Sequence, residues 1–179
     1  MKNKLFYIFF FGLIISIYRL IPHPPNFTPV LSFAIMLPLL LKDRILSIAV
    51  VVIPMFISDI FIGFHSYQFI IYVTLITITL ISPMQKNYSF LSLMAVVSSV
   101  WFFLTTNFSV WLMWDYYPKT YEGLISCFIL AIPFFQNTIL STILFTGLLT
   151  FSLKYLEKIN INTNIFVLSF LNKSFNLKF

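Results

Sequence analysis

A run of prolines near the start of the chain interrupts what would otherwise be one long apolar segment. Residues 19–29 read RLIPHPPNFTP, with strongly apolar sequence on both sides. Proline fixes its own φ angle, lacks an N–H group and disfavours helical geometry in the residue before it, so no helix can continue through this stretch. We therefore expect a stiff loop that places a cation, an imidazole, an amide and a hydroxyl beside apolar surroundings: Arg19, His23, Asn26 and Thr28.

The chain as a whole is too apolar for a soluble domain. Apolar residues make up 60% of the sequence and charged residues only 9%, whereas soluble domains are usually about a quarter charged. The expected fold is therefore an all-α integral membrane protein. Its 179 residues allow one compact bundle of about six spans, because each span takes about 20 residues. We expect the spans at about residues 5–21, 30–41, 45–63, 67–84, 90–106 and 137–156, within a single domain over residues 1–156.

Three segments differ from a standard span. Residues 30–41 are short, so they form either a thin or tilted span or a re-entrant one. Residues 105–137 are rich in polar and aromatic side chains and are predicted to be a long fifth loop. Within this loop, residues 123–135 contain Pro133 and are expected to form an interfacial or re-entrant half-helix. The tail, residues 157–179, is predicted to lie in the cytoplasm or on the membrane surface.

The basic residues predict the orientation of these spans. If the amino terminus is cytoplasmic and all six segments cross, the inner side holds all 11 Lys and Arg residues except Arg19 and Lys119. This excess of inner cations matches the positive-inside rule, and it requires residues 30–41 to cross. The predicted location is a bacterial inner membrane, with both termini cytoplasmic. The cations form no patch of the kind that binds nucleic acid, so no nucleic-acid partner is expected.

The same topology gathers polar side chains at the outer end of the bundle. They come from the loops that follow spans 1, 3 and 5 and from the adjoining span ends; loop 1 is the proline-rich stretch within residues 19–29. We expect them to line one substrate-binding cavity: Arg19, His23, Asn26, Asp59, His65, Asn107, Trp111, Asp115 and Asn137. Asp59 lies inside an apolar span, where an ionisable group needs a polar partner or water. The alternative to substrate binding is that Asp59 forms a structural pair with Arg19.

Catalytic and metal-binding patterns do not accompany these residues. The sequence has no serine-nucleophile motif and no glycine-rich phosphate loop, so we expect neither an enzyme nor a bound cofactor. His23, His65, Asp59 and Asp115 do not have the spacing of metal ligands, so no metal is expected. The single cysteine, Cys127, excludes an internal disulfide and is expected to be an inert buried thiol.

Four short motifs resemble those of a family of small, uncharacterised bacterial inner-membrane proteins, and the resemblance covers nearly the whole chain. The motifs are Arg19 to Pro29, Ser58-Asp59 with Gly63 and His65, Thr106-Asn107-Phe108 with Trp111, and Pro133-Phe134 with Asn137. At the level of architecture, the predicted bundle is similar to the S components of energy-coupling-factor (ECF) vitamin transporters. This resemblance implies capture of a small organic nutrient by a protein embedded in the lipid bilayer, with an energising membrane subunit and ATPases as partners.

Two functions therefore stay open. The first is a substrate-binding and uptake protein that captures a small organic nutrient, such as a vitamin, at an extracytoplasmic pocket. The second is a non-transporting scaffold or assembly subunit whose outer loops dock another envelope protein. The first function predicts a small ligand, and the second predicts a stable heteromer without one. A membrane hydrolase with His23 or His65 as its base ranks last, because a nucleophile is missing.

Overall fold

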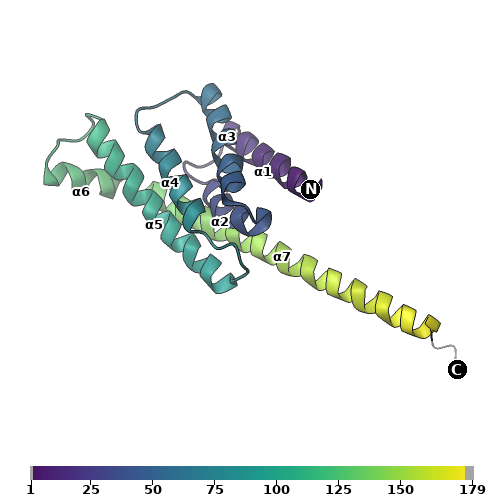
Figure 1. Ribbon diagram of the computed structural model, residues 1–179. Coiled ribbons are helices and arrows are strands. Elements are labelled where there is room, and N and C mark those ends of the chain that lie inside the picture. Colours follow the sequence, from purple (N-terminus) through teal and green to yellow (C-terminus); the bar gives the residue numbers. More distant parts are fainter. Residues whose placement is uncertain (1, 176–179) are drawn as a thin grey trace. The chain divides into compact units, whose positions relative to one another are not determined.

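The computed structural model describes residues 2–175, and the secondary structure in that range is entirely helical (Figure 1). The helices are α1 (Lys2–Leu20), α2 (Val30–Leu41), α3 (Arg44–Ile62), α4 (Gln68–Ile81), α5 (Tyr88–Met113), α6 (Tyr121–Leu130) and α7 (Ile132–Phe175). Within the described part of the chain, three stretches are long and apolar enough to cross a membrane, namely Arg44–Ile62, Tyr88–Met113 and Ile132–Ile159. The chain divides into two compact units, Met1–Thr146 and Gly147–Phe179. The site described below lies within the first unit.

Helix α2 forms the core of the first unit. Eleven of its 12 residues are buried, and it packs against α1, α3, α4 and α5. The hydroxyl of Ser32 also donates a hydrogen bond of 3.0 Å to the carbonyl of Thr142 in α7. A helix of this length is only about 18 Å long, so the surrounding helices can enclose it on all sides.

Local sequence fixes both ends of α2. Pro29 occupies the N-cap position, where the missing N–H group costs nothing. At the other end Lys42 adopts a left-handed conformation (φ 54°), and its N–H group bonds the carbonyl of Pro38. Asp43 then begins α3 by accepting a hydrogen bond of 3.0 Å from the N–H group of Leu46, as an N-cap residue does.

Two small residues of α1 lie against α3. Gly12 lies opposite Pro54, whose Cγ would be 3.3 Å from a Cβ atom at position 12. One turn later, the hydroxyl of Ser16 lies 3.5 Å from the carbonyl oxygen of Pro54. Small side chains allow two helices to approach closely. The Gly12–Ser16 spacing therefore marks the side of α1 that meets α3.

The prediction of a long fifth loop from residue 105 is wrong, because α5 continues to Met113. The polar side chains in its last turns bond to backbone carbonyls within the helix. Thr106 bonds Phe102, and Asn107 bonds Phe103, each at 2.7 Å. Side chains of these types are compatible with either a loop or a helix that supplies such acceptors, and composition alone does not distinguish the two.

The limits of the expected half-helix at residues 123–135 also need correction. Helix α6 covers only Tyr121–Leu130, and Ala131 forms a turn before α7 begins at Ile132. Pro133 therefore lies in the first turn of α7, the part of a helix in which a proline fits without loss of a hydrogen bond. The proline marks the start of the next helix and not an interruption of α6.

Candidate functional site

Arg19 and Asp59 form an ion pair between the end of α1 and the last turn of α3. The side chain of Asp59 is only 2% exposed, whereas that of Arg19 is 18% exposed. The Nε atom of Arg19 also donates to the hydroxyl of Ser58 at 2.6 Å, and its Nη1 atom contacts the Met55 sulfur at 3.0 Å. The pair between Asp59 and Arg19, which the sequence analysis gave as the alternative to substrate binding by Asp59, is therefore present.

Asp59 has further partners in α4. Its Oδ1 atom accepts from Arg19, and its Oδ2 atom accepts from both Gln68 and Tyr72. The second N–H group of the Gln68 amide donates to the hydroxyl of Tyr72 at 2.5 Å. The amide oxygen of Gln68 accepts from the backbone N–H group of His65 at 3.2 Å. This polar cluster ties α1, α3 and α4 together, and it leaves both N–H groups of Gln68 occupied.

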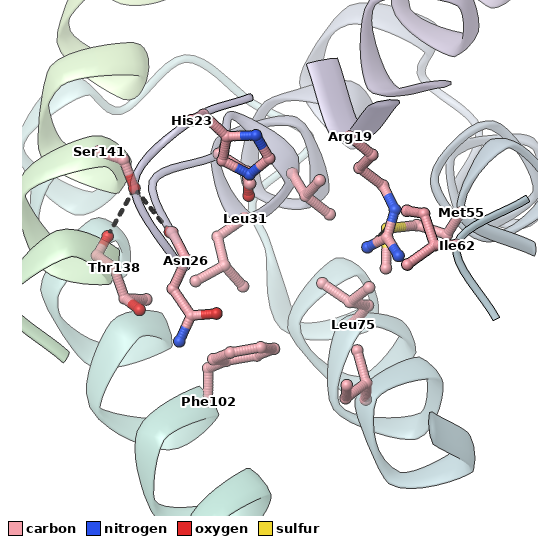
Figure 2. A pocket seen from close by; sticks show the side chains of 13 residues that line it. Arg19, His23, Asn26, Leu31, Met55, Ile62, Leu75, Phe102, Thr138 and Ser141 are labelled. Atoms are coloured by element: carbon pink, nitrogen blue, oxygen red, sulfur yellow. Dashed lines mark hydrogen bonds between the residues drawn. The ribbon is translucent and has the colours of Figure 1, made fainter. Parts of the chain in front are cut away.

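A cavity of about 290 Å³ lies beside the ion pair, and Figure 2 shows its lining. Arg19 lies on one side, and Asn26, Thr138 and Ser141 lie across the cavity from it. The surface between them is apolar, formed by side chains such as Leu75 and Phe102. The remaining lining residues come from loop 1 and from α2, α3 and α4: His23, Thr28, Val30, Leu31, Met55, Ile62 and Ile71. A small molecule with polar groups at two ends would fit such a lining.

A second cavity of about 370 Å³ adjoins the first. The two share Asn26, Ile71 and Phe102 in their linings. The second cavity brings Asn107 together with the aromatic side chains of the α5–α6 connection, namely Trp114, Tyr116 and Tyr117. The shared residues therefore separate a chamber beside Arg19 from a chamber rich in aromatic rings.

Loop 1 is held in place from α7. The side-chain amide of Asn137 donates a hydrogen bond of 3.0 Å to the carbonyl of Pro25, and the hydroxyl of Ser141 lies 3.5 Å from the carbonyl of Asn26. Asn26 itself has a positive φ of 62°, a conformation that asparagine tolerates better than most residues. Asn137 thus positions the loop and does not line either cavity.

His65 lies outside the cavity lining but close to the ion pair. It belongs to the turn between α3 and α4, where its ring lies 4.2 Å from that of Tyr67, and its Nε2 atom is buried without a hydrogen-bond partner. Burial lowers the pKa of His65 below the ordinary value of 6.5. The negative charge of Asp59 opposes this shift, and the positive charge of Arg19 adds to it.

The lowered pKa of His65 predicts a loss of stability in acid. The folded protein favours the neutral ring, so the unfolded chain binds protons more readily as the pH falls through 6.5. Stability is therefore fully present above that pH, and it declines as the pH falls further, until the folded form is also protonated. Unfolding temperatures measured in detergent from about pH 7.5 to about pH 5 should show this decline. A His65→Gln variant should reduce it, and an unchanged slope would contradict the assignment to His65.

Trp111 and Asp115 also lie apart from both cavities. The indole N–H of Trp111 donates to the carbonyl of Pro118 at 3.0 Å. Asp115 is fully exposed and lies 4.0 Å from the Lys119 amine. These residues organise or flank the α5–α6 connection. His23 does line the first cavity, and its Nδ1 atom lies 2.8 Å from the carbonyl of Ile21.

Several residues at the site were missed from the sequence. Gln68 and Tyr72 are one turn apart in α4 and face Asp59, and this spacing inside an apolar helix was a usable signal. Thr138 and Ser141 are likewise polar residues about one turn apart, in α7. Ser and Thr are common in apolar helices, however, where they bond to their own backbone. Among the described residues, no cluster of three or more His, Cys, Asp or Glu side chains could hold a metal ion.

Comparison with known proteins places the chain in a family without assigning it an activity. No curated protein and no solved structure matches the sequence. A family model described as a family of unknown function, DUF6580, matches residues 1–163. Since this match covers nearly the whole chain, the protein belongs to the DUF6580 family.

Proposed function

We propose that this protein is a six-span bacterial inner-membrane protein that binds a small organic nutrient from outside the cell and takes part in its uptake. Both termini would be cytoplasmic, and loop 1 would close the outer end of the bundle. An S-component-like role, with an energising membrane subunit and ATPases as partners, fits this arrangement by analogy of architecture.

The observation that carries this proposal is the cavity beside Arg19. It combines an apolar lining with a few polar side chains from loop 1 and α7, which is the usual composition of a small-molecule site. The proline-rich loop also favours binding, because a rigid loop loses little conformational entropy when a ligand arrives. A scaffold subunit would have no need for such a cavity. Formation of a stable heteromer without any ligand would instead favour the scaffold.

Filling the cavity tests the proposal directly. Ile71 lines both chambers, so an Ile71→Trp substitution should place an indole ring where a ligand would lie. We expect ligand affinity to fall at least about tenfold, because a bound molecule must then displace or avoid the ring. Ligands would first be identified by screening vitamins and related nutrients for thermal stabilisation of the purified protein, and affinities would then be measured by calorimetry.

A matched control adds the same ring elsewhere on α4. Phe69 is 70% exposed and lines neither cavity, so Phe69→Trp should leave the affinity unchanged. Equal affinities for the wild type and both variants would place the ligand outside this cavity. The absence of any stabilising ligand, together with a partner protein that copurifies in gentle detergent, would overturn the proposed function.

A further inference from the structure

The cavity beside Arg19 contains hydrogen-bond donors but no acidic side chain. A guanidinium has five N–H groups, and the three described contacts of Arg19, to Ser58, Met55 and Asp59, use three of them. Two N–H groups are thus left without a partner among the described residues. Arg19 itself lines the cavity.

Asp59, which pairs with Arg19, does not occupy the cavity in place of a ligand. Asp59 is 2% exposed and does not line the cavity, and its two oxygens accept from Arg19, Gln68 and Tyr72. The Asp59 carboxylate therefore holds the Arg19 guanidinium in place from outside the cavity lining. Residues of α1, α3 and α4 all contribute to the position of the guanidinium. A donor that is fixed before the ligand arrives binds an acceptor with little loss of entropy.

The start of α2 adds positive potential to the same cavity. Val30 and Leu31 both line it, and the N-cap residue Pro29 offers no side-chain hydrogen bond. The first N–H groups of a helix carry a partial positive charge that favours anions. The start of α2 and Arg19 therefore both favour an anion in the same cavity.

The rest of the lining defines the body of the ligand. Leu31, Leu75 and Phe102 offer an apolar surface, and Figure 2 shows Asn26, Thr138 and Ser141 across the cavity from Arg19. We propose that the ligand is a small carboxylate with a largely apolar body and a hydrogen-bonding group at its far end. Its carboxylate binds the unpaired N–H groups of Arg19. This inference rests on the binding function proposed above and specifies its substrate class.

Two probes that differ in one end group, a carboxylate in one and a neutral amide in the other, test this substrate class. 4-Hydroxyphenylacetate and 4-hydroxyphenylacetamide share one skeleton, and each has a hydroxyl group at the far end. Calorimetry with the purified full-length protein should show the carboxylate binding about 10- to 100-fold more tightly than the amide, because hydrogen bonds between charged groups are the stronger ones. Equal affinities would overturn the carboxylate assignment and leave the cavity as a small-molecule site. If neither probe bound at about 10 mM, the result would count against both the substrate class and the proposed function.

Variants then locate the preference within the cavity. An Arg19→Gln/Asp59→Asn double variant removes both charges together, so no unpaired charge is left buried. We expect it to bind both probes with similar affinity, while its unfolding temperature reports that it is folded. A Thr138→Val variant acts at the opposite end and should weaken both probes by the same factor. A carboxylate preference that survived in the folded double variant would show that Arg19 is not its source.

Discussion

Replacing Asp59 with leucine is expected to destabilise the protein by about 3–5 kcal/mol, the cost of leaving one member of a buried ion pair without its partner. Arg19 would lose its anion, and Gln68 and Tyr72 would lose their shared acceptor. A second substitution that removes the cation, Arg19→Met, should recover a large part of this loss, because an apolar pair carries no uncompensated charge. The free energy of unfolding, measured by titration with a denaturing detergent in mixed micelles, would report both effects.

An exposed carboxylate provides the control for this pair. Asp115 is fully exposed and lies 4.0 Å from Lys119, so Asp115→Leu should leave the free energy of unfolding nearly unchanged. If Asp59→Leu and the double variant were equally unstable, the cost would come from lost packing and not from the buried charge. A small effect of Asp59→Leu alone would mean that Arg19 finds another acceptor.

Gly123→Ala is expected to produce the second large effect. A Cβ atom at this position would lie 2.0 Å from the backbone oxygen of Pro118, so the connection between α5 and α6 would have to move. Such overpacking costs about 1–3 kcal/mol and occasionally more. The movement would also disturb the hydrogen bond from the indole of Trp111 to the same carbonyl. Unfolding measurements and the fluorescence of Trp111, in a variant with Trp101 and Trp114 replaced by phenylalanine, would detect both changes.

Gly147→Ala is the matched control within a helix. A Cβ atom at Gly147 would meet nothing within 4 Å, so alanine should be neutral or stabilise the helix by up to about 1 kcal/mol. Equal behaviour of the two variants would show that the contact between Gly123 and Pro118 does not constrain the fold. A fluorescence change without a loss of stability would place the effect in the connection alone.

Sequence reasoning succeeded where one residue type has one structural consequence. The prolines of loop 1 end α1 and precede α2, and the limits of α2, Val30–Leu41, can be read from Pro29 and from Lys42-Asp43. The link between Arg19 and Asp59 was foreseeable because two opposite charges in an apolar bundle have few other partners. Whether residues 30–41 cross a membrane stays a prediction.

The other features of the fold and the site depend on contacts in the folded chain that the order of residues alone does not show. Residues 105–113 looked like a loop because Thr, Asn and Ser are common in loops, yet their side chains bond to carbonyls within α5. The spacing of Gln68 and Tyr72 marks a polar pair in an apolar helix, but only the packing of α4 on α3 shows that the pair faces Asp59. The role of Asn137 likewise depends on where loop 1 lies, since its partner is Pro25.

The burial of α2 has a consequence for the order in which the helices pack during synthesis. Because 11 of its 12 residues are covered by neighbouring helices, α2 cannot reach its final environment until α3, α4 and α5 have been synthesised. Its packing must therefore be completed late, as the later helices close around it. The same enclosure predicts that a change in the volume of an α2 side chain must be compensated in an adjacent helix, because a packed interior tolerates neither voids nor extra volume.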